Sequence, residues 1–210
     1  MPARLRRLGS AKSVRVAAIP SFATRWVIPR LPAFQKTFPD IDLVVSYAKE
    51  FTGNLSGFDL LITYFDGPYT GDLESTILFS GALRPVCSPS YLQSRGPISQ
   101  PSDLASATLL HDEHRSTWIE WLTCRGIEAT SASSGTLFAD FNLLSTAAIA
   151  GHGVALCPCD LIRNDLAAGH LVQLFDGPIF TDRNYVLFKR PVSAIAVRQF
   201  SDWLVAETRG

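Results

Sequence analysis

The fold is decided by the stretch Leu83-Arg84-Pro85-Val86-Cys87-Ser88-Pro89-Ser90-Tyr91-Leu92. Its first five residues form a short apolar run that is typical of a buried strand, and Ser88-Pro89 then marks the start of a helix. Strand and helix patterns lie both before and after this stretch. We therefore interpret 83–87 as a crossover strand between two α/β halves, with a small-molecule cleft expected between the halves.

The first half has the order of a βαβ unit. Strands are predicted at 14–19, 41–47 and 58–64, and the strand at 58–64 is apolar enough to be central and parallel. A helix is predicted to follow the first strand. Ser21 is expected to be its N-cap, and Pro29 is expected to kink or restart it.

The second half repeats the alternation of strands and helices. Asp140 is expected to cap a helix that runs to Ala150, and its inward residues are predicted to be Leu143, Leu144, Ala147 and Ala148. A strand at 185–188 returns to the first half. A last helix at 192–206 follows, with the apolar stripe Ile195, Phe200, Trp203 and Leu204. The predicted division is a basic tail at 1–13, one subdomain from 14–82 plus 186–210, and a second subdomain at 83–185.

Charge and composition argue against a nucleic-acid surface on the body of the chain. The 210 residues carry 19 basic and 19 acidic side chains, and 47% of them are hydrophobic. Five basic residues and no acidic ones lie within residues 1–15, so the remainder is mildly acidic. Phosphate binding needs clustered Lys and Arg, which leaves the short basic tail as a solvated end or a DNA-facing linker.

The sequence contains no signature of a known catalytic motif. The G-x-S-x-G elbow, the Walker loop and the G-x-G-x-x-G turn are all missing, so no catalytic residue is predicted. No apolar stretch approaches a membrane span, and no apolar region follows the basic start, so a cytoplasmic protein is expected. The four Cys residues are interpreted as reduced core thiols.

Three strand ends are candidates for ligand contact, because open α/β sheets bind ligands there. They are Pro20-Ser21-Phe22, Tyr64-Phe65 and Phe138-Ala139-Asp140-Phe141. Helix capping explains Ser21 and Asp140 equally well, and core packing explains each Phe taken singly.

The densest polar cluster is His111-Asp112-Glu113-His114-Arg115. We interpret His111 as part of a loop rim that hydrogen-bonds a polar ligand, and a solvated loop is an equal alternative. The two His residues at a strand end do not form a recognisable metal-ligand set, so neither a metal nor a cofactor is predicted.

Seven segments together resemble the effector-binding domain of LysR-type transcriptional regulators. Their order and spacing over 14–207 carry the resemblance, which is strongest to the branch of the glycine-cleavage activator and the β-lactamase-inducing regulator. The segments are 19–31, Phe38-Pro39-Asp40-Ile41, 58–62, 85–89, Leu109-Leu110-His111-Asp112, 151–156 and 165–172.

The resemblance implies a type 2 periplasmic-binding-protein-like fold of two Rossmann-like subdomains joined by two crossover strands. It implies effector contacts from Pro20, Ser21, Phe22, Tyr47, Ala48, Tyr64, Phe65, Cys87, Ser88, Phe138, Asp140 and Phe141. It further implies a homodimer, or a tetramer of the full-length protein. DNA is expected to be bound only by the family's winged helix-turn-helix, which would precede Val14.

Two other functions share this fold and stay open at the level of sequence. One is a solute-binding protein of a transport system, which the missing export signal disfavours. The other is an enzyme that uses the His111–His114 cluster.

Overall fold

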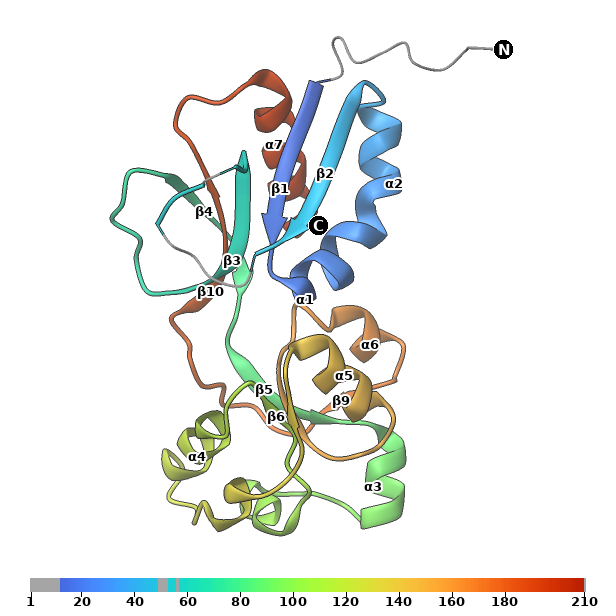
Figure 1. The fold of residues 1–210 in the computed structure, drawn as a ribbon. Coiled ribbons are helices and arrows are strands. Elements are labelled where there is room, and N and C mark those ends of the chain that lie inside the picture. Colours follow the sequence, from blue (N-terminus) through green and yellow to red (C-terminus); the bar gives the residue numbers. More distant parts are fainter. Residues whose placement is uncertain (1–11, 49–52, 56, 210) are drawn as a thin grey trace. The chain divides into compact units, whose positions relative to one another are not determined.

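The computed structural model describes residues 12–48, 53–55 and 57–209, and Figure 1 shows their helices and strands. These residues divide into two compact units. One unit ends at Phe79 and resumes at Asn184, whereas the other is the uninterrupted segment Ser80–Arg183. The chain therefore passes from one unit to the other twice.

The first unit is built on a five-stranded sheet with the strand order β2-β1-β3-β10-β4. The strands are β1 (Lys12–Ala18), β2 (Ile41–Tyr47), β3 (Leu60–Asp66), β4 (Glu74–Ser80) and β10 (Arg183–Lys189). β1 pairs in parallel with β2 and with β3, and the register places Ala18 beside both Tyr47 and Ile62. The predicted central, parallel position of the third strand is confirmed, although the strand begins at Leu60 rather than at Phe58.

The helical segment after β1 runs through α1 (Pro20–Phe22), the π-helical turn Ala23–Val27 and α2 (Ile28–Thr37). Its N-cap is Ile19, so the prediction that Ser21 caps this helix is wrong. The reason is Pro20, whose fixed φ suits the first helical position, so the helix starts two residues earlier than predicted.

The π-turn lies immediately before Pro29, where the sequence predicts a kink or a restart. The N–H of Ile28 donates to the carbonyl of Ala23, which is an i→i+5 bond. Proline has no N–H and clashes with the preceding turn, and a widened turn is one way to relieve that conflict.

The last helix, α7 (Ile195–Arg209), packs on β1 and meets α2 through aromatic rings. The Phe34 centroid lies 5.1 Å from that of Phe200 and 5.0 Å from that of Trp203. Ile195 is 61% exposed, so its predicted place in the apolar stripe is wrong. The helix begins three residues later than predicted, and its first residue lies outside the core.

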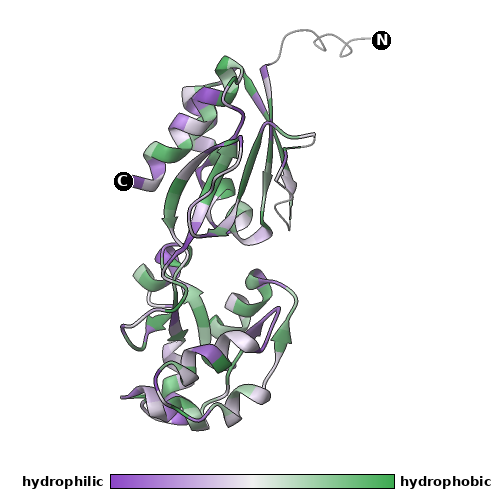
Figure 2. Cartoon of the chain, turned by 90° about the vertical axis from the view of Figure 1, so that its left-hand side faces the viewer, coloured by the Kyte–Doolittle hydropathy of each residue, from purple (hydrophilic) through white to green (hydrophobic). Residues whose placement is uncertain are grey.

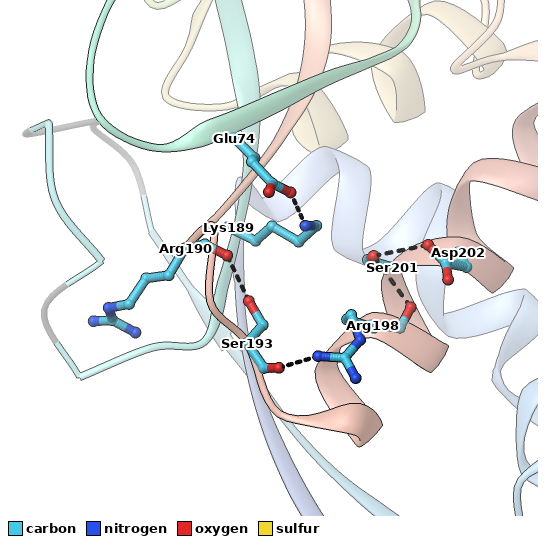
Figure 3. Close-up of polar contacts among 7 residues, drawn as sticks. All are labelled: Glu74, Lys189, Arg190, Ser193, Arg198, Ser201 and Asp202. Carbon is cyan, nitrogen blue, oxygen red and sulfur yellow. Dashed lines mark hydrogen bonds and ion pairs between the residues drawn. The ribbon is translucent and has the colours of Figure 1, made fainter.

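Polar contacts fix the connection between β10 and α7 (Figure 3). The Ser193 hydroxyl donates to the carbonyl of Arg190, and the Arg198 guanidinium donates to the carbonyl of Ser193, both at 2.5 Å. Lys189 pairs with the Glu74 carboxylate and so links β10 to its neighbour β4. The two hydrogen bonds satisfy backbone carbonyls of the connection, which lies outside both the strand and the helix.

The second unit contains a three-stranded sheet and a two-stranded one. β5 (Leu83–Cys87) lies between β8 (Ala155–Pro158) and β9 (Val172–Gln173) and is antiparallel to both. β6 (His111–Asp112) and β7 (Leu137–Phe138) pair in parallel. Since the chain leaves the first unit after Phe79, β5 is a central strand of the second unit rather than the connecting strand itself.

The helical elements of the second unit surround these strands (Figure 1). The α-helices are α3 (Pro89–Arg95), α4 (Ser116–Thr123), α5 (Phe141–Ile149) and α6 (Arg163–Ala167), and the 3-10 turns are Pro101–Ser106 and Thr130–Ser133. α5 packs against β5, β6, β7 and β8.

For helix α5, the predicted N-cap is correct, whereas one residue predicted to face the core does not. The Asp140 carboxylate accepts the N–H groups of Asn142 at 2.7 Å and Leu143 at 3.1 Å, which confirms the predicted cap. Leu143 is 52% exposed, however, and the prediction that it faces inward is wrong. The buried stripe is Phe141, Leu144, Ser145 and Ala148, whose helical spacing leaves Leu143 on another face.

Each unit has its own hydrophobic core. Figure 2 shows hydrophobic residues concentrated on the strands, while α7 carries hydrophilic residues between its hydrophobic ones. In the second unit Trp118 and Trp121 lie edge to face with centroids 5.7 Å apart, inside a cluster that includes Leu104 and Leu156. Within the described ranges, no helix has the length and apolar character needed to cross a membrane.

Candidate functional site

The predicted ligand residues of the first unit gather at one edge of its sheet. β1, β2 and β3 are parallel neighbours, so the segments that follow them emerge side by side. Backbone bonds fix this edge: the N–H of Ile19 donates to Ile62 at 3.0 Å, and that of Ala48 donates to Ala18 at 3.0 Å. Pro20 and Ser21 follow β1, Tyr47 ends β2 and Ala48 follows it. Tyr64 and Phe65 lie within β3, which ends at Asp66, so the prediction that they follow the strand is wrong.

The start of α1 offers backbone N–H groups at this edge. Ala23 is the first residue whose N–H bonds within the helix, to Ile19 at 3.1 Å. The N–H groups of Ser21 and Phe22 precede it, and helix geometry provides no acceptor for them within the helix. Such groups suit a carboxylate or a phosphate. The Ser21 side chain is 6% exposed.

Phe22 contributes to the core through its side chain. It is fully buried and stacks on Trp26, Phe79 and Tyr185, with centroids 5.4, 5.6 and 5.6 Å away. This aromatic cluster holds α1 against the sheet. In this structure Phe22 can therefore offer a ligand its backbone, while its ring has a packing role.

The aromatic residues at the ends of β2 and β3 differ in exposure. Tyr47 is 63% exposed and Tyr64 is 41% exposed, so both rings are open to solvent. Phe65 is half-buried and meets Tyr69 and Phe188 edge to face, with centroids 5.7 and 5.8 Å away. Tyr47 and Tyr64 are thus the more accessible candidates.

In the second unit, the parallel pair β6 and β7 brings a second group of candidates together. The register places His111 beside Leu137 and Asp112 beside Phe138, and Asp140 follows two residues later. Phe138 and Asp140 are half-buried, while Phe141 is 9% exposed. One oxygen of Asp140 serves the helix cap, and a carboxylate has acceptor capacity for further donors.

Cys87 and Ser88 lie in the interior of the second unit. Cys87 is fully buried, and burial raises the pKa of its thiol to about 11. Ser88 is 2% exposed, shares a hydrogen bond of 2.9 Å with the Ser90 hydroxyl and accepts the N–H of Tyr91 at 3.3 Å. The structure accounts for both side chains by packing and by capping of α3.

His111 is a buried residue rather than part of a solvated loop. Its side chain is 1% exposed. This burial is the main reason why the pKa of the imidazole is lowered. Its Nε2 lies 2.6 Å from the carbonyl of Ser134. Because a carbonyl only accepts, Nε2 carries the proton, and the ring fastens the turn at 130–133 to β6.

Sequence reasoning missed three residues at these edges. Thr63 is a polar side chain only 3% exposed at the carboxyl end of β3, and Tyr185 closes the aromatic cluster around Phe22. Asp112 belonged to the recognised polar cluster but was not selected as a site. Asp112 is half-buried, and this burial, followed by Glu113 and Asp140, raises the pKa of its carboxyl to about 7. An acidic residue that directly follows an apolar strand was the available signal.

No group of three or more His, Cys, Asp or Glu side chains in the described part of the chain could hold a metal ion. The side chains and backbone groups at the two edges offer hydrogen bonding, charge and aromatic contact. These interactions are suited to recognising a small molecule.

Comparison with known proteins places this architecture among bacterial regulators. Residues 8–209 match the family model described as the LysR substrate binding domain. The chain is 32% identical over 202 residues to the glycine cleavage system transcriptional activator of Escherichia coli K12, covering 94% of this chain and 66% of that protein. It is 31% identical over 210 residues to the transcriptional activator AmpR of Rhodobacter capsulatus, covering 97% of this chain and 71% of that protein.

A solved structure supports the same assignment. The AmpR effector binding domain from Citrobacter freundii superposes with a TM-score of 0.78 at 27% identity, covering 94% of this chain and 98% of that one. The expected type 2 periplasmic-binding-protein-like α/β fold is thereby confirmed, as is the resemblance drawn from the sequence. The chain spans about two thirds of the length of the Escherichia coli relative.

Proposed function

The chain belongs to the family of LysR substrate-binding domains, and we propose that it senses a small-molecule effector, with candidate contact residues at the strand edge of each unit. The family match over residues 8–209 is the observation that carries the proposal. The matched relatives are transcriptional regulators and not enzymes, so the domain is regulatory. This also favours a regulator over the alternative, a solute-binding protein of a transport system.

The proposal assigns complementary chemistry to the two edges. The N–H groups at the start of α1 would donate hydrogen bonds to an anionic group of the effector, with Ser21, Tyr47, Ala48 and Tyr64 around it. Asp140 would accept hydrogen bonds from a donor group of the effector, beside Phe138 and Phe141. The contribution of Cys87, Ser88 and His111 would be to keep these segments in place.

The proposal also covers how effector binding acts on the full-length regulator. Effector binding would shift the population of two states of the regulator and so change how its DNA-binding part is presented. We propose a homodimer and a cytoplasmic location, because the relatives regulate transcription. DNA contact would come from the regulator's helix-turn-helix rather than from the mildly acidic domain described here.

The test combines a ligand screen with variants at both edges. Thermal-shift screening with amino acids, muropeptides and aromatic acids should identify a stabilising ligand, since a ligand at one hundred times its Kd stabilises a protein by about 2.7 kcal/mol. Isothermal titration then measures its Kd for Ser21→Ala and Asp140→Asn. Each variant is expected to weaken binding about tenfold, the cost of one hydrogen bond.

The choice of variants separates binding from folding. Asn caps helices as well as Asp does, so Asp140→Asn keeps the start of α5. The matched control is Asp160→Asn, which changes an acidic side chain of the second unit that pairs with Arg163 and is not among the candidate ligand residues. If Ser21→Ala and Asp140→Asn both keep the wild-type Kd while they fold normally, these residues are not the effector site. Turnover of the ligand would instead indicate an enzyme.

A further inference from the structure

Backbone hydrogen bonds fasten the segment 134–138, which contains β7, to β6 and the turn after it. The N–H of His111 donates to the carbonyl of Thr136 at 3.0 Å, and the N–H of Glu113 donates to the carbonyl of Phe138 at 2.9 Å. In the described part of the chain, β6 is the only strand that pairs with β7. The position of β7 in the second unit is therefore set by its bonds to this one neighbour.

Two side chains of the same polar cluster bond the carbonyls that come just before β7. The Nε2 atom of His111 lies 2.6 Å from the carbonyl of Ser134, and the guanidinium of Arg115 donates to the carbonyl of Gly135 at 2.8 Å. The His111 ring is buried, and its Nδ1 atom bonds none of the described residues, so its polar contact is Ser134. The bond from Arg115 is charge-assisted and therefore stronger than a bond between neutral groups.

Gly135 lets this turn approach the strand closely. Its φ of 100° lies in the region that favours glycine. A Cβ at this position would collide with the carbonyl oxygen of Leu109 and would lie 3.3 Å from Nε2 of His111. The turn thus lies directly against the chain that leads into β6, where two side-chain donors meet two consecutive carbonyls.

We propose that His111 and Arg115 are positioning residues of the effector site. By bonding two consecutive carbonyls, they fix the turn that leads into β7 and thereby place Phe138 and Asp140. This inference rests on the proposed function, because Phe138 and Asp140 matter for binding only if the domain takes up an effector. Both positioning residues act through the backbone, and neither needs to touch the effector.

Native-state hydrogen exchange without any ligand tests whether the two side chains fix β7. The Glu113 amide reports on the side that faces β7. The Leu110 amide is the internal reference, because it bonds the carbonyl of Val154 at 2.9 Å instead. His111→Leu and Arg115→Met should each lower the protection of the first amide about tenfold relative to the reference, the effect of one hydrogen bond. General destabilisation would lower the protection of both amides together.

Two further variants separate the loss of a donor from damage to the core. Gln offers an amide donor in place of the ring N–H, so His111→Gln should restore the Glu113 protection that His111→Leu removes. Arg125→Met is the matched control, because the Arg125 guanidinium also donates to a glycine carbonyl of this unit, that of Gly177. If His111→Leu does not fold, Arg115→Met still decides. An unchanged ratio in Arg115→Met, or the same loss in the control, would overturn the proposal.

Isothermal titration then tests the link to effector binding. The probe is the amino acid, muropeptide or aromatic acid that gives the largest thermal shift with the wild-type chain. Its Kd should rise about tenfold in Arg115→Met and keep the wild-type value in His111→Gln and Arg125→Met. A wild-type Kd in a variant whose Glu113 amide has lost protection would overturn the positioning role. A screen without any hit would count against the proposed function, and hydrogen exchange would still support or overturn the fixing of β7.

Discussion

Two consecutive residues of the second unit respond to burial in opposite directions. Burial lowers the pKa of His111 and raises that of Asp112, because in each case it disfavours the charged form. Both residues belong to the polar cluster visible in the sequence. Their environment could not be predicted, since Asp140 and Arg183, which act on Asp112, are distant from it in the sequence.

The raised pKa of Asp112 predicts how stability depends on pH. The folded state binds this proton more tightly than the unfolded state. The resulting gain in the free energy of unfolding is complete below about pH 4 and is lost as the pH rises through about 7. Asp112→Asn, which cannot ionise, should therefore be more stable than the wild type at pH 8, by roughly 1–3 kcal/mol.

Urea denaturation at pH 4, 6 and 8 measures this difference. The gap between Asp112→Asn and the wild type should shrink as the pH falls and should be absent near pH 4. Asp160→Asn serves as the control and should not show the same trend. A variant that is less stable than the wild type at pH 8 would mean that the carboxylate makes a favourable contact there.

At the scale of elements, the sequence predicted a helix cap correctly but misassigned which residues of two helices face the core. The Asp140 cap was predictable because it involves only the next three residues. Leu143 and Ile195 were misplaced because apolar character alone does not select the buried face of a helix. The stripe of α5 includes the polar Ser145, which the strands of the second unit cover.

Helix α1 depends on its aromatic cluster, because it has no side-chain cap. Phe22→Ala should remove the central ring from among Trp26, Phe79 and Tyr185 and lower the free energy of unfolding by about 3–5 kcal/mol. Ile28→Ala, at a 48% exposed position of α2, is the matched control, with an expected change within about 0.5 kcal/mol. Urea denaturation measures both, and equal losses would refute a core role for Phe22.

At the scale of the whole molecule, the sequence predicted two α/β halves and the family, and the fold and family are confirmed. The prediction succeeded because strand order and turn residues are recorded locally along the chain. The candidate ligand residues remain a prediction. Where the structure places Cys87, Ser88, Phe22 and His111 in cores, the reason is side-chain packing between segments that no local pattern specifies.

The two crossings of the chain predict an asymmetry in folding. The second unit is one continuous segment that contains both strands of β6–β7, all three strands of the β8-β5-β9 sheet and a complete hydrophobic cluster. A fragment of residues 80–183 should therefore fold alone. A fragment of residues 1–79 lacks β10, which lies between β3 and β4, and should not fold.

Dispersed amide NMR signals and the buried fluorescence of Trp118 and Trp121 would report a folded 80–183 fragment. A collapsed spectrum with exposed tryptophans would show that its core depends on the rest of the chain.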